Sequence, residues 1–330
     1  MERQARRYSL GSLLLTATIL LLAPGTGWGH GVVGKRFFPA MVTVEDPFVA
    51  DEMGVMVDHI KGQEAMMTEL ELEIQKRLGP NLSIGFSGSY RIMEPSGDPR
   101  GMSGEGEEMG SPGTAYGFSN PAFSLNYQFL RDPERELAGT LSFGIEAGGV
   151  GAKRVGALSG TTITPSLQLG KGFGDLPDWA DYLKPLAVTG SLGVNNLVSG
   201  RGETEDAQNN LAWGVTIMYS IPYLQSFVMD VGIPWPFSLL FPVVEFNGET
   251  ILSGDRRGET TAFANPGLIW AGKYLELAVE AKIPLNDLSG RQVGIVGLVH
   301  LFLDNIAPEI FTWTPFHGVL GPTYMGPAHH

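Results

Sequence analysis

Residues 68–92 read TELELEIQKRLGPNLSIGFSGSYRI, and this stretch decides the fold. Apolar side chains occupy the even positions and polar ones the odd positions up to the Gly79-Pro80-Asn81 turn signal, with Lys76 as the exception. The same alternation resumes after the turn, from Leu82 onward. A period of two places successive side chains on opposite faces of a strand, so the stretch predicts a β-hairpin.

A helix is the alternative for the first half of the stretch. Met66, Leu70, Ile74 and Leu78 also share one helical face, and Glu, Leu, Gln and Lys all favour helices. Leu72 fits that face poorly, and the Ser-, Gly- and aromatic-rich second half is a poor helix former. We therefore interpret the pair as two strands of about eleven residues each, a length that suits a tilted bilayer crossing.

Alternating segments recur along the rest of the chain. They cover residues 123–129, 137–147, 162–169, 186–194, 211–219, 223–233 (less regular), 244–252, 260–271, 275–283 and 293–303. The sequence therefore predicts an all-β protein, an antiparallel transmembrane β-barrel of about twelve strands within a range of roughly ten to fourteen. A soluble periplasmic β-sandwich is the alternative; strand length and aromatics near strand ends favour the barrel.

Four regions are expected along the chain. Residues 1–29 have an N-terminal cluster of arginines, an apolar run and small residues Gly27 and Gly29 before a cut at His30, the pattern of a cleaved signal peptide. Residues 30–65 form an N-terminal periplasmic or lumenal segment, 66–304 the barrel, and 305–330 a C-terminal tail that ends in His329-His330.

The order of the loops conflicts with this division. If both termini are periplasmic, the tight turn at Gly79-Pro80-Asn81 faces outward and the long Gly- and Pro-rich loop 94–115 faces the periplasm. Outer-membrane barrels normally show the reverse. A strand hidden within residues 36–45 would remove the conflict.

Composition narrows the classes of function. The chain has no cysteine, so disulfides, thiol catalysis and cysteine-based metal sites are excluded. Its net charge of −13 argues against nucleic acid as a partner. The expected partners are the outer-membrane lipid bilayer and a small-molecule solute, and no cofactor is expected.

Several motifs resemble a known family. These are GFSNP (117–121), YQFLRDPE (127–134), TP (164–165), GKGFGDLP (170–177) and EAKIPLN (280–286). They are similar to proteobacterial outer-membrane proteins labelled as transporters of the MetA pathway of phenol degradation, over roughly residues 66–305. The resemblance implies an outer-membrane barrel and passage of small molecules, and it carries no catalytic residue over. Outer-membrane barrels often end on an aromatic residue of the last strand, whereas here a Pro-rich tail follows Phe302.

The function expected is passive passage of small molecules through the outer membrane. Acidic side chains on the presumed lumen face would bias such a pore toward cations, although the lumen of any barrel is polar. These candidates are Glu69, Glu71, Glu73, Glu146, Glu245, Glu276 and Glu280.

Two other functions stay open. In the first, the barrel is a non-conducting surface or metal-binding protein, in which residues 30–65 and the tail fill the lumen. In its metal-binding version, the α-amino group and imidazole of a mature N-terminal His30 bind copper or nickel. In the second, it is a barrel hydrolase, for which His300 on the last strand is the one histidine to consider, with no partners identifiable from sequence. We do not expect an enzyme.

Overall fold

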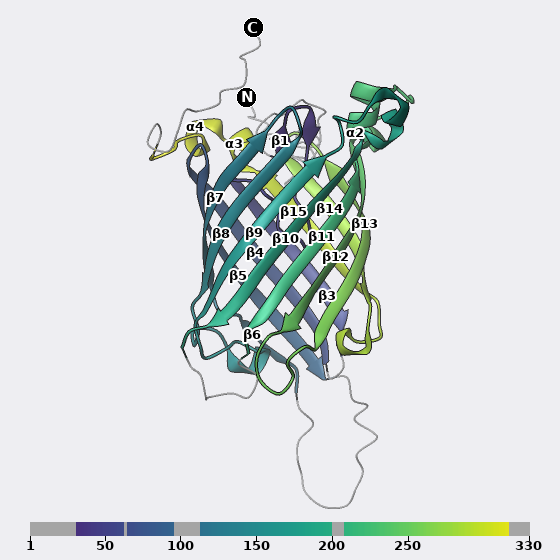
Figure 1. Ribbon diagram of the computed structural model, residues 1–330. Helices are drawn as coiled ribbons and strands as arrows, with labels where there is room; N and C mark the ends of the chain where they lie inside the picture. Colours follow the sequence, from purple (N-terminus) through teal and green to yellow (C-terminus); the bar gives the residue numbers. More distant parts are fainter. Residues whose placement is uncertain (1–30, 63–64, 96–112, 200–207, 317–330) are drawn as a thin grey trace, which may run out of the picture.

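A closed antiparallel barrel is the main feature of the computed structural model, which describes residues 31–62, 65–95, 113–199 and 208–316. Each long strand pairs with the next one in sequence, and β15 pairs with β3 to close the ring. The twelve barrel strands are β3 (Glu52–Lys61), β4 (Ala65–Gly79), β5 (Leu82–Pro95), β7 (Ala122–Asp132), β8 (Leu137–Glu146), β9 (Thr162–Gly172), β10 (Leu186–Leu197), β11 (Asn210–Tyr219), β12 (Leu240–Ile251), β13 (Thr260–Ala271), β14 (Leu275–Pro284) and β15 (Gly294–Phe302). The short β6 (Ala115–Phe118) pairs with β5 beside β7. The predicted fold class is confirmed (Figure 1).

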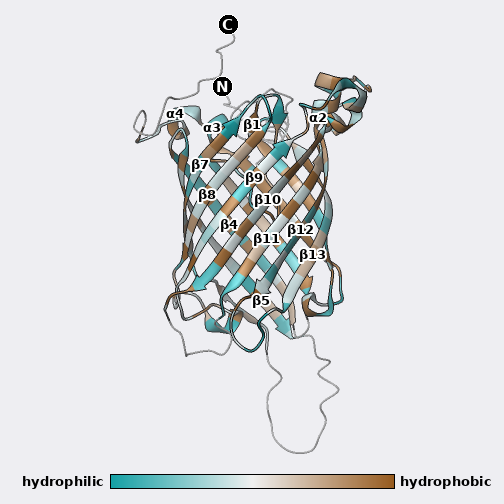
Figure 2. Cartoon of the chain, in the orientation of Figure 1, coloured by the Kyte–Doolittle hydropathy of each residue, from teal (hydrophilic) through white to brown (hydrophobic). Residues whose placement is uncertain are grey.

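Side chains alternate between the two faces of the wall as the period of two predicts. On β4, Leu70, Leu72 and Ile74 are exposed on the outside, while Gln75 is buried inside. The pattern continues around the ring, so apolar bands alternate with polar ones along the strands (Figure 2). Apolar side chains outside and polar ones inside are typical of barrels that span a bilayer. The helices in the described ranges are all too short or too polar to cross a membrane.

Two strand assignments are wrong, and the two errors cancel in the count. The barrel begins at Glu52, not at residue 66, because residues 52–61 form β3. Their alternation is hidden by Met56 and Ile60, which point inward yet are apolar. Conversely, residues 223–233 form no strand; they belong to a helical excursion between β11 and β12, made of α2 (Ile221–Tyr223), η3 (Leu224–Val228) and η4 (Phe237–Leu239).

Adding β3 reverses the direction predicted for β4 to β11 and removes the loop conflict, while the loss of a strand at 223–233 restores the predicted direction from β12 onward. The turn after β4 now lies at the same end as α3 (Leu303–Ile306) and α4 (Pro308–Phe311), and the Phe316 backbone N–H donates to the Leu78 carbonyl there. The β5–β6 connection leaves from the opposite end; its residues 96–112 lie outside the described ranges. We call the end with α3 and α4 the terminal end and the other the distal end.

The N-terminal residues 31–51, which we call the lumenal segment, precede β3. They start with a small hairpin of β1 (Val32–Val33) and β2 (Arg36–Phe37) at the terminal end. The hidden strand expected within residues 36–45 is therefore absent as a barrel strand; only Arg36–Phe37 pair, and they pair with β1. Because residues 38–51 belong to no strand ladder, their backbone N–H and C=O groups need other hydrogen-bond partners.

Candidate functional site

The lumenal segment lies inside the barrel. Its apolar side chains are buried against inward-facing residues of the wall, and together they form the main hydrophobic core. The segment contributes Val33, Phe38, Met41, Val42, Val44 and Phe48, and the wall contributes Ala138, Ala187, Met218, Phe241, Val243, Ile269, Ala271, Ala278, Val296 and Leu298. One part of the lumen is thus packed like a protein interior.

Carboxylates of the wall accept hydrogen bonds from the backbone of the segment. Glu276 Oε2 on β14 accepts from the Ala40 N–H at 2.9 Å. Glu245 on β12 accepts from the Val42 N–H at 3.0 Å through Oε1, and from the Thr43 N–H at 2.7 Å and Thr43 Oγ1 at 2.6 Å through Oε2. These bonds supply partners for N–H groups that no strand ladder satisfies.

Side chains of the opposite wall hold the second half of the segment. Gln75 on β4 accepts from the Ala50 N–H at 3.0 Å. The Pro47 carbonyl accepts from Gln128 Nε2 of β7 at 3.0 Å and from Thr140 Oγ1 of β8 at 2.8 Å. Contacts that reach β4, β7, β8, β12 and β14 from one segment are possible only from within the barrel.

Buried charges fix the start of the segment. Arg36 is fully buried; its Nε lies 3.1 Å from Glu136 Oε2, and Nη1 donates to the Pro185 carbonyl at 2.8 Å. Its guanidinium also lies 3.9 Å from the ring centre of Tyr223. Burial lowers the pKa of Arg36, an effect that Glu136 opposes, and burial raises the pKa of Tyr223 to about 12.

A second charge cluster fixes the end of the segment. Asp51 is fully buried and lies 2.5 Å from Lys76 Nζ and 3.2 Å from Arg77 Nη2. Arg77 also approaches Asp304 of α3 at 3.7 Å. The segment is therefore attached at both of its ends, and the described part of the C-terminal region packs on the same rim.

A cavity of about 550 Å³ lies in the lumen beside the segment. The segment from Ala40 to Asp46 forms part of its lining, and β3, β4, β8 and neighbouring strands form the rest. Its carboxylates are Glu45, Asp46, Glu52, Asp58, Glu71, Glu73 and Glu146, and its basic side chains are Lys282 and His300. The excess of carboxylates makes the cavity a region of negative potential, which favours cations.

Two carboxylates, one of which lines the cavity, lie beside the ring of His300. Its Nε2 lies 3.3 Å from Glu52 and its Nδ1 3.6 Å from Glu276. Asp46 of the lumenal segment is enclosed by the barrel wall although it reaches the cavity. This enclosure, together with the nearby Glu52, raises the pKa of Asp46 well above its ordinary value.

The seven glutamates predicted for the lumen all lie on the inner face but in four different settings. Glu71, Glu73 and Glu146 line the cavity. Glu69 pairs with Arg91 at 2.8 Å and Glu245 and Glu276 bind the segment. Glu280 is almost fully buried, and neither of its oxygens has a hydrogen-bond partner among the described residues.

The sequence missed the part of the site contributed by residues 45–58. Glu45, Asp46, Glu52 and Asp58 bring four carboxylates to the cavity, from a region without a sustained period. The clustering of acidic residues between 45 and 58 was the available signal, but only the topology shows that they face the same lumen as β4.

Neither alternative chemistry gains a site within the described residues. His30, the proposed metal ligand, lies outside the described residues. Within the ranges that the structure describes, no group of three or more His, Cys, Asp or Glu side chains is arranged to hold a metal ion. His300 has carboxylate neighbours, and the centre of its ring lies 5.3 Å from that of Phe302. Among the described residues, no serine or threonine hydroxyl is hydrogen-bonded to it.

No family model matches the chain, and no curated protein matches it. The resemblance to the phenol-degradation transporters therefore stays a prediction. Similar solved structures include a NanC porin, at 9% identity and a TM-score of 0.44 over 76% of this chain and 98% of that one. A KdgM porin in complex with disordered oligogalacturonate has 12% identity and a TM-score of 0.42 over 75% and 98% of the two chains. Outer membrane phospholipase A from Escherichia coli has 13% identity and a TM-score of 0.37 over 82% and 98%. Porins and an enzyme both occur among these barrels, so the function has to be argued from the chain itself.

Proposed function

We propose that this protein is an outer-membrane channel that takes small cationic solutes into an acidic cavity and passes them when the lumenal segment moves. The observation that carries the proposal is the cavity of about 550 Å³, whose lining has seven acidic side chains against one lysine and one histidine; six of the seven remain when Asp46, which keeps its proton, is left out. A volume of this order suits a small organic molecule or a hydrated ion.

The outer face of the wall supports the bilayer location. Large apolar side chains are exposed on every side of the ring, including Ile84, Phe143, Leu192, Ile217 and Val279. Exposing these apolar side chains to water would cost free energy, whereas lipid acyl chains solvate them. Closure of the sheet leaves no unpaired strand edge in lipid.

The loops support the orientation. At the terminal end the turns after β4, β7 and β13 are short and the connections after β9 and β11 are long and helical, whereas the distal connections after β5, β8, β10, β12 and β14 all exceed those short turns. Because short turns are typical of the periplasmic side, we assign the terminal end to the periplasm. The distal end then faces outward.

Single-channel conductance of the refolded mature protein in a planar bilayer, under a salt gradient, tests the proposal. We expect brief cation-selective openings, with selectivity reduced in a Glu71→Gln, Glu73→Gln double variant. Glu134→Gln, on the exposed β7–β8 turn, is the matched control and should leave selectivity unchanged. Openings with the same selectivity in both variants would contradict the role of the cavity.

A non-conducting barrel is the second candidate. The packing of the lumenal segment into the core favours it, because a channel that never releases the segment passes nothing. A protein that is folded and inserted but silent at all voltages and salt concentrations would support this alternative over the channel.

A further inference from the structure

We propose that two helical excursions at the terminal end form a lipid anchor that lies in the headgroup region of the adjacent leaflet. They are residues 173–185, which contain η2 (Asp178–Leu183), and residues 220–239, which contain α2, η3 and η4. We call them together the rim anchor. The inference rests on the proposed bilayer crossing and goes beyond channel activity.

The rim anchor is longer than the other connections at its end of the barrel. Figure 1 shows α2 and the chain around it beyond the end of the strands and to one side of the wall. Periplasmic turns of barrels are normally short, so two long helical connections between neighbouring strand pairs call for a physical reason.

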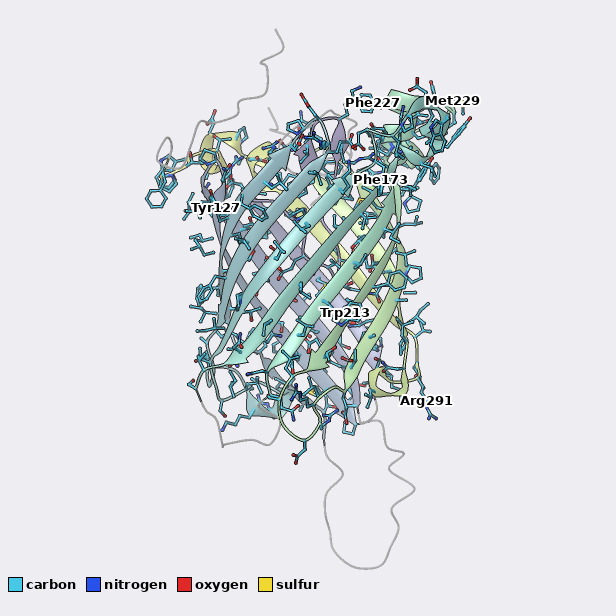
Figure 3. All side chains as sticks on the ribbon, viewed as in Figure 1. Tyr127, Phe173, Trp213, Phe227, Met229 and Arg291 are labelled. Atoms are coloured by element: carbon cyan, nitrogen blue, oxygen red, sulfur yellow. The ribbon has the colours of Figure 1, made fainter. Side chains whose placement is uncertain are left out.

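The side chains on this surface are apolar and aromatic. Trp179 is 85% exposed, Tyr182 63%, Phe237 57% and Trp235 50%. Phe227 and Met229 of the second excursion, residues 220–239, are also exposed, and Figure 3 labels both beyond the barrel wall. Tryptophan and tyrosine combine an apolar ring with a polar N–H or O–H, which suits the boundary between acyl chains and water.

Polar contacts hold the anchor in shape from within. Gln225 accepts from the Ile233 N–H at 2.7 Å, and Trp270 Nε1 of β13 donates to the Pro236 carbonyl at 3.1 Å. Tyr219 at the end of β11 donates to the Tyr182 carbonyl at 3.3 Å, which joins the two excursions. The anchor thus uses these polar groups internally and exposes large apolar ones. Its exposed carboxylates, Asp175, Asp178 and Asp230, suit the headgroup region and not the acyl chains.

Continuity with the lipid-facing wall identifies the occupant. Val215, Ile217 and Tyr219 follow one another on the outer face of β11, and the chain enters the anchor directly after Tyr219. An acidic partner protein is not indicated, because Lys184, the one basic side chain of the anchor, is already paired with Asp181 at 2.7 Å and Asp178 at 3.2 Å. The apolar surface of the anchor thus continues the outer face of β11, and the lipid that surrounds this face is the partner that we infer for the anchor.

Site-directed labelling tests the anchor, since the natural chain has no cysteine. Val231→Cys reports the anchor, Leu192→Cys the middle of the wall and Glu134→Cys the water-exposed turn at the same end as the anchor. Each full-length variant carries an environment-sensitive fluorophore and is refolded into phosphatidylcholine–phosphatidylglycerol vesicles that contain lipid spin-labelled near the headgroup or deep in the acyl chain. Aqueous iodide is the water-phase quencher.

We expect the Val231 label to be quenched at least twofold more strongly by the shallow spin label than by the deep one, and less by iodide than the Glu134 label. The Leu192 label should respond to the deep spin label. If Leu192 responds and Val231 behaves like Glu134, the anchor is wrong while the bilayer crossing stands. If neither responds to spin-labelled lipid, the bilayer crossing itself fails. Phe227→Cys on η3 replaces Val231→Cys if that variant does not refold.

Discussion

Replacing Glu245 by glutamine should loosen the lumenal segment without unfolding the barrel. Glutamine keeps the size of the side chain but turns one acceptor oxygen into an NH₂ donor. Since the Val42 and Thr43 N–H groups donate to different oxygens of Glu245, one of them loses its acceptor whichever way the amide points.

The structure sets the size of the effect. Hydrogen bonds to a charged group contribute about 1.5–3 kcal/mol each, and every 1.4 kcal/mol changes a population roughly tenfold. Loss of one such bond should therefore raise the population of displaced segment roughly 10- to 150-fold. If displacement opens the channel, the open probability in a planar bilayer should rise by that factor.

Glu69→Gln is the matched control. Glu69 is also an inward-facing glutamate of the wall, but its partners are Arg91 and Ser89 rather than the lumenal segment. Its replacement should leave the open probability unchanged. Equal open probabilities in both variants and the natural protein, with all three folded, would refute the reasoning.

A disulfide should reverse the effect of Glu245→Gln. A Cβ atom built on Gly214 would lie 2.8 Å from Val44 Cγ2, so cysteines at these two positions bring a sulfur close enough to bridge. We expect the oxidised Val44→Cys, Gly214→Cys form to be silent and dithiothreitol to restore openings. Openings that persist after complete oxidation would show that solutes pass without movement of the segment around Val44.

Three further predictions concern stability and pH. Arg36→Ala leaves Glu136 buried without its cation and should cost about 3–5 kcal/mol, measured by denaturant unfolding of the inserted barrel. Asp46→Asn should stabilise the protein at neutral pH but not below about pH 4. The raised pKa keeps a proton on folded Asp46 that the unfolded chain has lost, so stability falls as pH rises through that window, and the amide removes the loss; melting curves against pH measure it. Gly34→Ala should destabilise the terminal hairpin, because φ is +63° and the new Cβ would lie 2.2 Å from the Pro133 carbonyl oxygen; limited proteolysis measures it.

A specific result would contradict each of these three predictions. An Arg36→Met, Glu136→Gln double variant should recover much of the loss, and no recovery would mean that the buried pair is not its source. A gain from Asp46→Asn that is equal at pH 4 and pH 8 would exclude titration of Asp46. Gly156→Ala is the control for Gly34→Ala, since Gly156 has a φ of +83° with open space around its Cβ position. Equal sensitivity in both would exclude the contact with Pro133.

The hairpin of residues 68–92 was predictable because lipid and lumen impose opposite demands on alternate positions. Where the lumen is apolar, this signal disappears: β3 carries Met56 toward the lumenal segment and its alternation fades. The strand predicted at residues 223–233 was wrong for the opposite reason. These residues form a helical excursion, and its exposed apolar side chains give a pattern similar to that of a lipid-facing strand.

The site was less predictable than the barrel. Sequence alternation predicts the inner face for Glu245 and Glu276, but it gives no hint that they bind backbone N–H groups of residues 40–43. Those partners lie more than two hundred positions away, and the lumenal segment has no period of its own to indicate where it packs.

Binding through the backbone has a consequence for how such a barrel can diversify. Glu245 and Glu276 hold the N–H groups of Ala40, Val42 and Thr43, and every residue except proline has that group. Substitutions of Ala40 and Thr43 would therefore alter the floor of the cavity while most of its attachment persists. In the proposed channel, substitutions at a few positions of the lumenal segment could therefore change the selectivity without any change in the twelve strands of the barrel.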